Sequence, residues 1–474
     1  MRGVIIAMAL GLAAGVSGAA GAPPPLASSL TAVEVRSVEP AGTYGGVAYV
    51  KVGGTVRGVV DPNDLVVGLG DQPKNAAGLF EYTSGFEIIA PAAGQATNEV
   101  IYVDSENRGS AISQGALGGF LQTHATSYAR VQWQTGISPG VPARAQGVGL
   151  AIMRDFGRWL SGRTPQTKVS GDFKPIAYRK LMLGGISQSA WLVNTLIAEG
   201  FNVDPQSGRG VYDAAIAVDG VGAWLAINQI AADRGVAQSP YVDPNGLPLT
   251  RLQLMSRPKT DPLYIDVANY TDYYRLRASL TATDYSGANF RRYDWPSPHA
   301  VGTQASLARC NGGKPITTNP LRYSAYMRAL VLGMEKAIGV KAAASAKPLP
   351  PSTLFKLGPP PPASEGFNAL PGVALKVPLV DGDAWPLGGV RFPEAAFPMG
   401  RPLPASVPPA ITTSINSTCG NSGGFQPLTA DELALRAKRP DIGWYRQALR
   451  DLTDRGYLLA EDAEAMARAP YFAR

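Results

Sequence analysis

A serine at the end of a short apolar run is the strongest candidate for chemistry in this chain. In Gly185-Ile186-Ser187-Gln188-Ser189, the residues two before and two after Ser187 are small. A strand that turns sharply into a helix needs small residues there, because the turn holds its central residue in a strained backbone conformation. The pattern predicts a nucleophile elbow that lifts the Ser187 hydroxyl above the sheet edge. The N–H groups at the start of the following helix would then face developing negative charge.

A serine nucleophile needs a base, because its hydroxyl scarcely ionises at neutral pH. The chain has only two histidines, His124 and His299. Where such an elbow carries a catalytic triad, the order along the chain is Ser, then Asp or Glu, then His. That order excludes His124, which we expect to cap or pack near the start of a strand. His299 lies in the loop YDWPSPHAVG after the last predicted strand, and is the predicted general base.

The acid partner is expected at the carboxyl end of a strand between Ser187 and His299. Asp272 follows the strand-like run PLYIDVANY and is the preferred position. Its carboxylate would accept the Nδ1 proton of His299, fix the tautomer and stabilise the imidazolium. Asp219 ends the preceding strand-like run, YDAAIAVDG, and is the alternative acid.

An oxyanion hole requires two N–H donors close to the nucleophile. The first expected donor is the backbone N–H of Gln188, directly after the serine. The second is expected in the loop SENRGSA, from Asn107, Arg108 or Gly109, where the glycine permits close backbone approach. A plain glycine turn is the alternative interpretation of this loop. The chain has no CxxC and no Cys/His cluster, so no metal or cofactor is predicted.

The elements that position these residues are expected in a region of alternating strands and helices. Residues 98–341 show this alternation, which predicts a mostly parallel sheet flanked by helices, with a small helical insertion at 221–257. Residues 23–97 alternate polar and apolar positions between Gly, Asp and Pro turns, which predicts a β-rich N-terminal part. Together with the elbow, this organisation indicates an α/β-hydrolase fold.

Residues 342–474 are expected to pack on that core. The segment up to 410 is rich in proline and has the composition of a flexible linker. We favour an ordered wrap, because it carries too many large apolar side chains for a solvated tether: Phe355, Phe367, Trp385, Phe392 and Phe397. Thr429 and Glu432 then form a capping-box pattern, and two amphipathic helices follow, separated by Gly456.

The first 22 residues have the pattern of a secretory signal: a basic residue, an apolar stretch and then small residues. An uncleaved anchor helix is the alternative. We expect an exported protein, periplasmic or secreted, without stable membrane insertion. Cys310 and Cys419 fit that compartment and predict one disulfide, closing a loop of 419 − 310 = 109 residues, with two buried free thiols as the alternative.

The overall charge argues against nucleic acid as a partner. The 474 residues include 43 basic and 36 acidic side chains, a net charge of +7, and no run of Lys or Arg exceeds a pair. Scattered charge of this kind lacks the basic patch that binds a phosphate backbone. The sequence does not predict an oligomeric state.

Several segments resemble the secreted bacterial family of alpha/beta hydrolase domain-containing proteins, in which G-x-S-Q-S-G-R is usual at the elbow. The segments are GISQSAWLVNTLIAEGFN, GRGVYDAAIAVDG, VIYVDSENRG, RVQWQTG, GVGLAIMRDFGRWL, RRYDWPSPHA, LGGVRFPEAAFP and LLAEDAEAMARA. The resemblance implies an esterase-like serine hydrolase with its nucleophile at Ser187 and its histidine at His299. The Thr-Glu of the family falls on Thr271-Asp272, and Ala190 and Trp191 depart from its Gly-Arg.

The resulting expectation is hydrolysis of a carboxylic ester, small or polymeric, through a Ser-His-Asp triad and an acyl-enzyme. A lactonase or an amidase would use the same residues. A non-catalytic exported ligand-binding protein built on a hydrolase shell is the alternative from a different class.

Overall fold

The computed structural model describes residues 27–95, 98–174, 176–241, 246–282, 287–300, 317, 319, 321–341, 346–360, 372–404, 421–435 and 441–473. The expected signal segment, Phe367, Cys310 and Cys419 lie outside these residues, so the export signal and the disulfide stay predictions. Within the described ranges, no helix has both the length and the apolar character that crossing a membrane requires.

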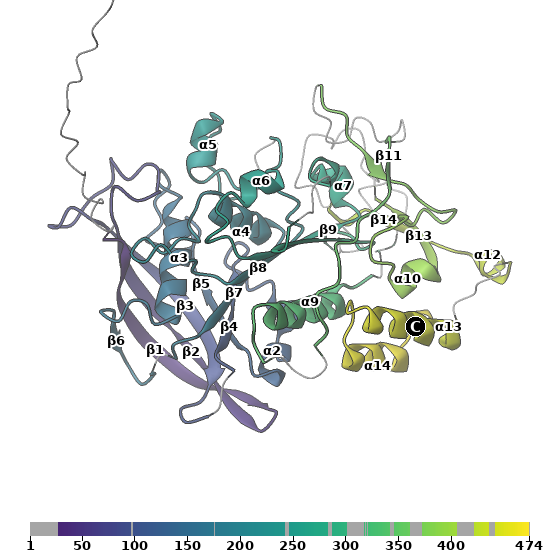
Figure 1. Cartoon of the computed structure of the whole chain (residues 1–474), viewed down its shortest axis with the longest axis horizontal. Coiled ribbons are helices and arrows are strands. Elements are labelled where there is room, and N and C mark those ends of the chain that lie inside the picture. The colour runs from purple at the N-terminus through teal and green to yellow at the C-terminus, as the bar shows by residue number, and fades with distance from the viewer. Residues whose placement is uncertain are drawn as a thin grey trace, which may run out of the picture.

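A large twisted sheet runs through the molecule (Figure 1). Its ten strands in the described ranges lie in the order β10-β9-β8-β7-β4-β5-β3-β2-β1-β6. Neighbours from β10 to β5 pair in parallel, which confirms the mostly parallel sheet of this part of the chain. These strands are β4 (Val100–Ser105), β5 (Ser127–Val131), β7 (Lys180–Ile186), β8 (Ala214–Val218), β9 (Leu263–Asn269) and β10 (Phe290–Trp295).

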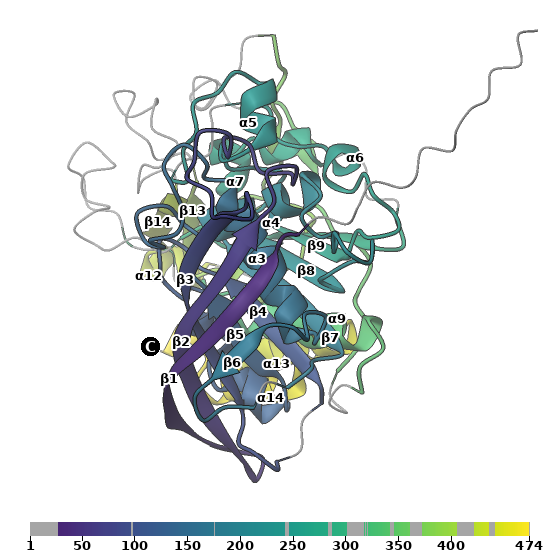
Figure 2. The same cartoon turned by 90° about the vertical axis from the view of Figure 1, so that its left-hand side faces the viewer.

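The β-rich N-terminal part extends the same sheet. It comprises β1 (Ser29–Tyr44), β2 (Val47–Val60) and β3 (Phe80–Pro91), which pair antiparallel with one another. Strand β3 also pairs antiparallel with β5, and Figure 2 shows the long β1 and β2 in front of the parallel strands. The short edge strand β6 (Lys168–Ser170) was not predicted, because three exposed residues carry no apolar periodicity.

Alternating side chains of the parallel strands feed two separate cores, as the two-residue period of a strand requires. On β4, Ile101 and Val103 enter the core that contains α3 (Val148–Leu160) and α4 (Gln188–Ala198). Val100 and Tyr102 enter the core that contains α9 (Ser324–Ala337) and α13 (Ile442–Asp454). Helices therefore cover both faces, and the site-bearing strands are buried on each side.

Shorter helices lie in the connections. They are α1 (Gln114–Leu117), α2 (Phe120–Thr123), α7 (Asp272–Arg275) and the 3₁₀ turn η1 (Ala278–Leu280). The region expected as a small helical insertion, 221–257, contains α5 (Gln229–Asp233) and α6 (Arg251–Leu254) among its described residues. Most of that region is irregular, because Gly and Pro interrupt its apolar pattern.

The C-terminal part packs on the core that contains α9. Phe392 stacks on Tyr326 of α9 at a ring-centroid distance of 3.5 Å, and Trp385 is buried. Thr429 and Glu432 form the expected capping box. The elements are β11 (Leu357–Gly358), β12 (Val377–Pro378), α10 (Pro393–Ala396), β13 (Gly400–Leu403), β14 (Gly424–Pro427), α12 (Ala430–Ala434), α13, α14 (Ala460–Arg468) and the 3₁₀ turn η5 (Tyr471–Ala473).

Candidate active site

Ser187 lies at the sharp corner between β7 and α4. Its backbone has φ +59° and ψ −125°, a conformation that is rare for a residue with a side chain. A Cβ on Gly185 would lie 2.4 Å from the Ser189 carbonyl, so the corner requires glycine there. Ser189 contributes more than small size: its Oγ accepts the Ile186 N–H at 2.8 Å and donates to the Ile186 carbonyl at 2.9 Å. Ser189 therefore stabilises the corner through both backbone groups of Ile186.

The structure brings Ser187, His299 and Asp272 into one hydrogen-bonded chain. His299 Nε2 lies 2.7 Å from Ser187 Oγ, and His299 Nδ1 lies 2.7 Å from Asp272 Oδ1. Asp272 begins α7, directly after β9, and its Oδ2 accepts the Asn269 N–H at 2.8 Å. With Nδ1 donating to Asp272, Nε2 is left as the acceptor for the serine proton. Ser187 is half-buried, whereas the other two side chains are buried.

Thr271 fixes the loop that carries the histidine. Its Oγ1 accepts the backbone N–H of His299 at 2.8 Å and donates to the Asn421 carbonyl at 3.1 Å. Residue 271 therefore links the end of β9, the histidine loop and the C-terminal wrap. Apart from the adjacency of Thr271 and Asp272, no pattern in the sequence indicates this role.

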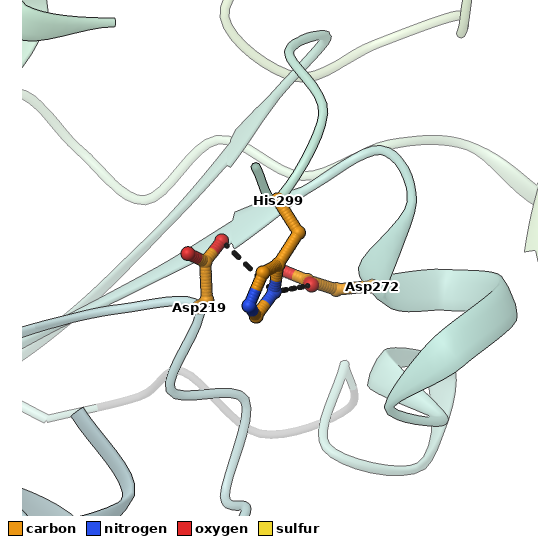
Figure 3. Close-up of side chains that lie close together, drawn as sticks. All are labelled: Asp219, Asp272 and His299. Carbon is orange, nitrogen blue, oxygen red and sulfur yellow. Dashed lines mark hydrogen bonds and ion pairs between the residues drawn. The ribbon is translucent and has the colours of Figure 1, made fainter. Parts of the chain in front are cut away.

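Asp219 lies beside the same imidazole. Its Oδ1 is 3.5 Å from His299 Nδ1, and Figure 3 shows Asp219 and Asp272 on either side of the ring. Asp219 follows β8 and has φ +64°, again unusual for a residue other than glycine. Asp272 is the preferred acid from the sequence and Asp219 the alternative, yet the fold brings both to His299, with Asp272 in the closer contact.

The surroundings shift the pKa of His299 downward. Burial lowers the pKa of His299 first, and the nearby positive charge of Arg275 lowers it further, against the opposing effect of Asp272. The Arg275 guanidinium lies 3.5 Å from His299 Nδ1 and 5.2 Å from the centre of the Trp191 ring. A lowered pKa keeps the imidazole neutral, which is the form that can accept the serine proton.

The expected oxyanion loop forms a tight turn beside the elbow. Asn107 and Ser110 exchange two backbone hydrogen bonds of 2.9 Å, and the turn residues Arg108 and Gly109 have φ +50° and +79°. The Arg108 N–H donates to the Gln188 side chain at 3.2 Å, so a ligand would have to displace that bond. The backbone N–H of Gln188 and the turn around Gly109 remain the proposed donors.

The side chain of Gln188 has a role that the motif did not indicate. It is buried, accepts from the Arg108 N–H, and donates from Nε2 to Gln134 Oε1 at 3.3 Å and to the Pro240 carbonyl. It therefore links the elbow to the oxyanion loop and to the segment after α5. A short pattern cannot reveal these partners, because they lie more than fifty residues away in the chain.

The other histidine takes no part in this arrangement. His124 is the C-cap of α2, close to the start of β5 as expected, and its Nε2 lies 3.0 Å from Glu461 of α14. Among the described residues, Asp219, Asp272 and His299 are the group of His, Cys, Asp and Glu side chains whose ligand atoms lie within 4.8 Å of one another. Both ring nitrogens of His299 face hydrogen-bonding partners, Asp272 and Ser187, and this arrangement suits proton transfer.

Comparisons with known proteins give a family and distant structural neighbours. The family described as "Alpha/beta hydrolase domain" matches residues 28–468. The comparison with curated proteins finds no match. A solved glucuronoyl esterase from Teredinibacter turnerae is 13% identical, with 54% of this chain and 66% of that chain covered at a TM-score of 0.29.

Two further neighbours are similar at the same level. Est1E from Butyrivibrio proteoclasticus is 10% identical, with 45% of this chain and 84% of that chain covered and a TM-score of 0.25. A glucuronoyl esterase from Solibacter usitatus is 12% identical, with 53% of this chain and 70% of that chain covered and a TM-score of 0.28. The chain spans 66% of the Teredinibacter turnerae enzyme, slightly less than two thirds of that protein's length. Values this low support no inference about substrate.

Proposed function

Since the chain belongs to the alpha/beta hydrolase domain family, we propose that it hydrolyses carboxylic esters through an acyl-enzyme formed on Ser187. The observation that carries this proposal is the pair of 2.7 Å contacts linking Ser187 Oγ to His299 and His299 to Asp272. They give the hydroxyl a neutral base and give that base a carboxylate partner. A ligand-binding shell would not need this alignment.

In the first half of the reaction, Ser187 Oγ attacks the ester carbonyl carbon while His299 Nε2 takes the hydroxyl proton. The Asp272 carboxylate stabilises the imidazolium that forms. The tetrahedral oxyanion would be held by the Gln188 N–H and a donor of the 107–109 turn. The bond to the alcohol oxygen then breaks, and the Nε2 proton passes to the departing alcohol.

In the second half, water attacks the acyl carbon and Nε2 takes its proton. The bond from the acyl carbon to Ser187 Oγ breaks, and the serine recovers the proton from Nε2. The products are a carboxylic acid and the free enzyme. No step requires a cofactor. A small-molecule or polymer ester, handled outside the cytoplasm after export, is the proposed substrate.

The test is covalent labelling with a fluorophosphonate, followed by peptide mass analysis. We expect one phosphonyl adduct on Ser187, together with hydrolysis of 4-nitrophenyl acetate. The Ser187→Ala variant should lose the adduct and lower kcat by about 10⁶, as removal of the nucleophile does in a comparable triad. An unlabelled but folded protein would instead support the non-catalytic binding function. Parallel assays on lactones and anilides separate lactonase and amidase activity from esterase activity.

A further inference from the structure

The site contains one more acid than a Ser-His-Asp triad uses. His299 Nδ1 carries one hydrogen, and Asp272 Oδ1 at 2.7 Å is its nearer partner. Asp219 Oδ1 lies 3.5 Å from the same nitrogen, and both aspartates are fully buried. Burying a second carboxyl group without a cation bound to it is costly unless another role compensates for the loss of hydration.

The contacts of Asp219 suit a neutral carboxyl group. Its Oδ1 accepts a hydrogen bond from Asn269 Nδ2, and Ser297 Oγ in turn donates to Asn269 Oδ1. Its Oδ2 is buried and accepts no hydrogen bond among the described residues. An ionised carboxylate needs donors at both oxygens, whereas a protonated one can itself donate from one of them.

On balance, the charges around Asp219 also favour the neutral form, because Asp272 raises its pKa more than the positive charge of Arg275 lowers it. The titratable and charged groups that face it are Asp272 and Arg275 of α7, His299 of the loop after β10, and Tyr323 at the start of α9. Helix α4 contributes only the indole N–H of Trp191, which donates to the Asp219 backbone carbonyl at 3.0 Å. A carboxylate oxygen of Asp219, one of Asp272 and a ring nitrogen of His299 all lie within 4.8 Å of one another. Two negative charges this close in a fully buried site disfavour each other, so that one of the two acids keeps its proton.

We propose that Asp219 is a positioning residue that stays protonated and donates a hydrogen bond to the Asp272 carboxylate, so that the two acids share one negative charge beside His299. Burial first, and the negative charge of Asp272 second, raise the pKa of Asp219 well above its usual value, in agreement with this arrangement. The inference rests on the proposed triad, because it assigns Asp219 a task within it.

Two consequences follow if Asp219 and Asp272 share one proton. The hydrogen bond from Asp219 holds Asp272 against His299 Nδ1, and Asp272 in turn keeps the proton of His299 on Nδ1. If Asp272 is made neutral, its repulsion, which adds to burial in keeping Asp219 protonated, disappears. Asp219 then ionises and becomes the carboxylate partner of His299, from an oxygen that is already 3.5 Å away.

The activity test is a double-mutant cycle with 4-nitrophenyl acetate as the substrate. Asp219→Asn should lower kcat less than about tenfold, because a carboxamide N–H also donates to Asp272. Asp272→Asn should cost less than the ~10⁴ seen when a triad has no second acid, and the double variant should approach that full loss. Asp219→Ala, which lacks a donor, should lose more than Asp219→Asn.

The cycle contradicts the proposal if Asp219→Asn costs the same factor in both backgrounds, because the two acids would then act independently. It also contradicts the proposal if Asp219→Asn alone costs more than Asp272→Asn, because Asp219 would then be the ionised partner.

An infrared difference spectrum tests the protonation state without any turnover. The spectrum of the wild type minus that of Asp219→Asn, both at pH 7, should contain the carbonyl stretch of a protonated carboxyl group. Absence of that band overturns the proposal for Asp219. A folded Ser187→Ala variant that keeps wild-type hydrolysis overturns the proposed function instead, so the two failures are distinguishable.

Discussion

Asp64 and Asp219 are both buried aspartates, but Asp64 is hydrogen-bonded to a cation, whereas Asp219 lies beside a second carboxyl group. Asp64 receives two hydrogen bonds from the Arg154 guanidinium, of 2.9 and 2.7 Å, and belongs to a cluster built on α3. In that cluster Arg154 also binds Asp155, and Arg158 forms ion pairs with Asp155 and Asp204. Asp219 instead contacts a second acid and a neutral imidazole.

The partners reverse the direction of the pKa shift. Burial raises the pKa of Asp64, but the charge and hydrogen bonds of Arg154 outweigh it and leave that pKa below its usual value. At Asp219, burial and the neighbouring carboxylate act in the same direction and raise the pKa. A cluster that stabilises the fold pairs each acid with a cation, whereas the candidate site keeps like charges together. Ser187 and Asp219 also have strained backbones with positive φ, and such strain is more common at functional sites than in clusters that only stabilise the fold.

The largest expected effect is at the base. His299→Ala should lower kcat for ester hydrolysis by about 10⁶, as loss of the histidine does in a comparable triad, while the protein stays folded. His124→Ala is the matched control, because His124 contacts Glu461 on the molecule's C-terminal helix and should leave kcat unchanged. Steady-state kinetics with circular dichroism measure both. A His299→Ala variant that retains a hundredth of the activity would exclude His299 as the general base.

The next effect falls on stability. Asp64→Asn removes one of the two carboxylate partners of the buried Arg154 and leaves Asp155 as the other. It should lower the free energy of unfolding at pH 7 by up to about 3–5 kcal/mol, the cost of breaking a buried ion pair. The native pKa of Asp64 is lowered, so its stabilising effect is present above ~3.9 and is lost as pH falls through the native pKa. Chemical denaturation should therefore show a smaller difference in the free energy of unfolding between the wild type and Asp64→Asn at pH 3 than at pH 7. A large loss of kcat in the folded variant would contradict a purely structural role.

The same substitution at Asp219 should change stability in the opposite direction. The unfolded aspartate ionises above ~3.9, whereas native Asp219 keeps its proton, so the wild type loses stability as pH rises through this range. Asp219→Asn does not titrate, and its advantage over the wild type should grow by at most ~1.4 kcal/mol for each pH unit above ~4, until the native pKa is reached. Thermal unfolding from pH 4 to pH 8 measures the trend. A variant that is less stable than the wild type throughout would mean that native Asp219 is ionised.

Part of the candidate site could be predicted from the sequence, and part could not. The elbow around Ser187 was predictable, because a strand, two small residues and a helix are adjacent in the chain. Asp219 and Asp272 were both recognised at strand ends, since parallel strands place their carboxyl ends at one edge of the sheet. The simultaneous contact of both acids with His299 could not be predicted, because it depends on the φ +64° backbone of Asp219 and on side-chain directions set by distant residues.

The partners of the elbow were unpredictable for a related reason. The side-chain bonds of Gln188 to Gln134 and Pro240 join segments that only the completed sheet brings together. The buried wrap at Phe392 and Trp385 was expected from its aromatic content, because large apolar side chains are seldom left in water. The three-residue strand β6 was missed, because its sequence has no periodicity and its pairing with β1 is decided by the strand beside it.

The smallest expected effect is the position of the rising limb in the pH dependence of kcat/KM. The proposed mechanism needs neutral His299, and burial together with Arg275 lowers the pKa of that residue. The limb should therefore have its midpoint below ~6.5, the value for an unperturbed histidine. Arg275→Met removes the positive charge 3.5 Å from Nδ1 and should move the midpoint upward, because Asp272 then favours the imidazolium with less opposition. Arg158→Met, a comparable loss of a buried cation in the α3 cluster, should lower stability but leave the midpoint in place. If both variants shifted the midpoint equally, the effect would come from the general loosening of the fold, and Arg275 would have no specific influence on the base.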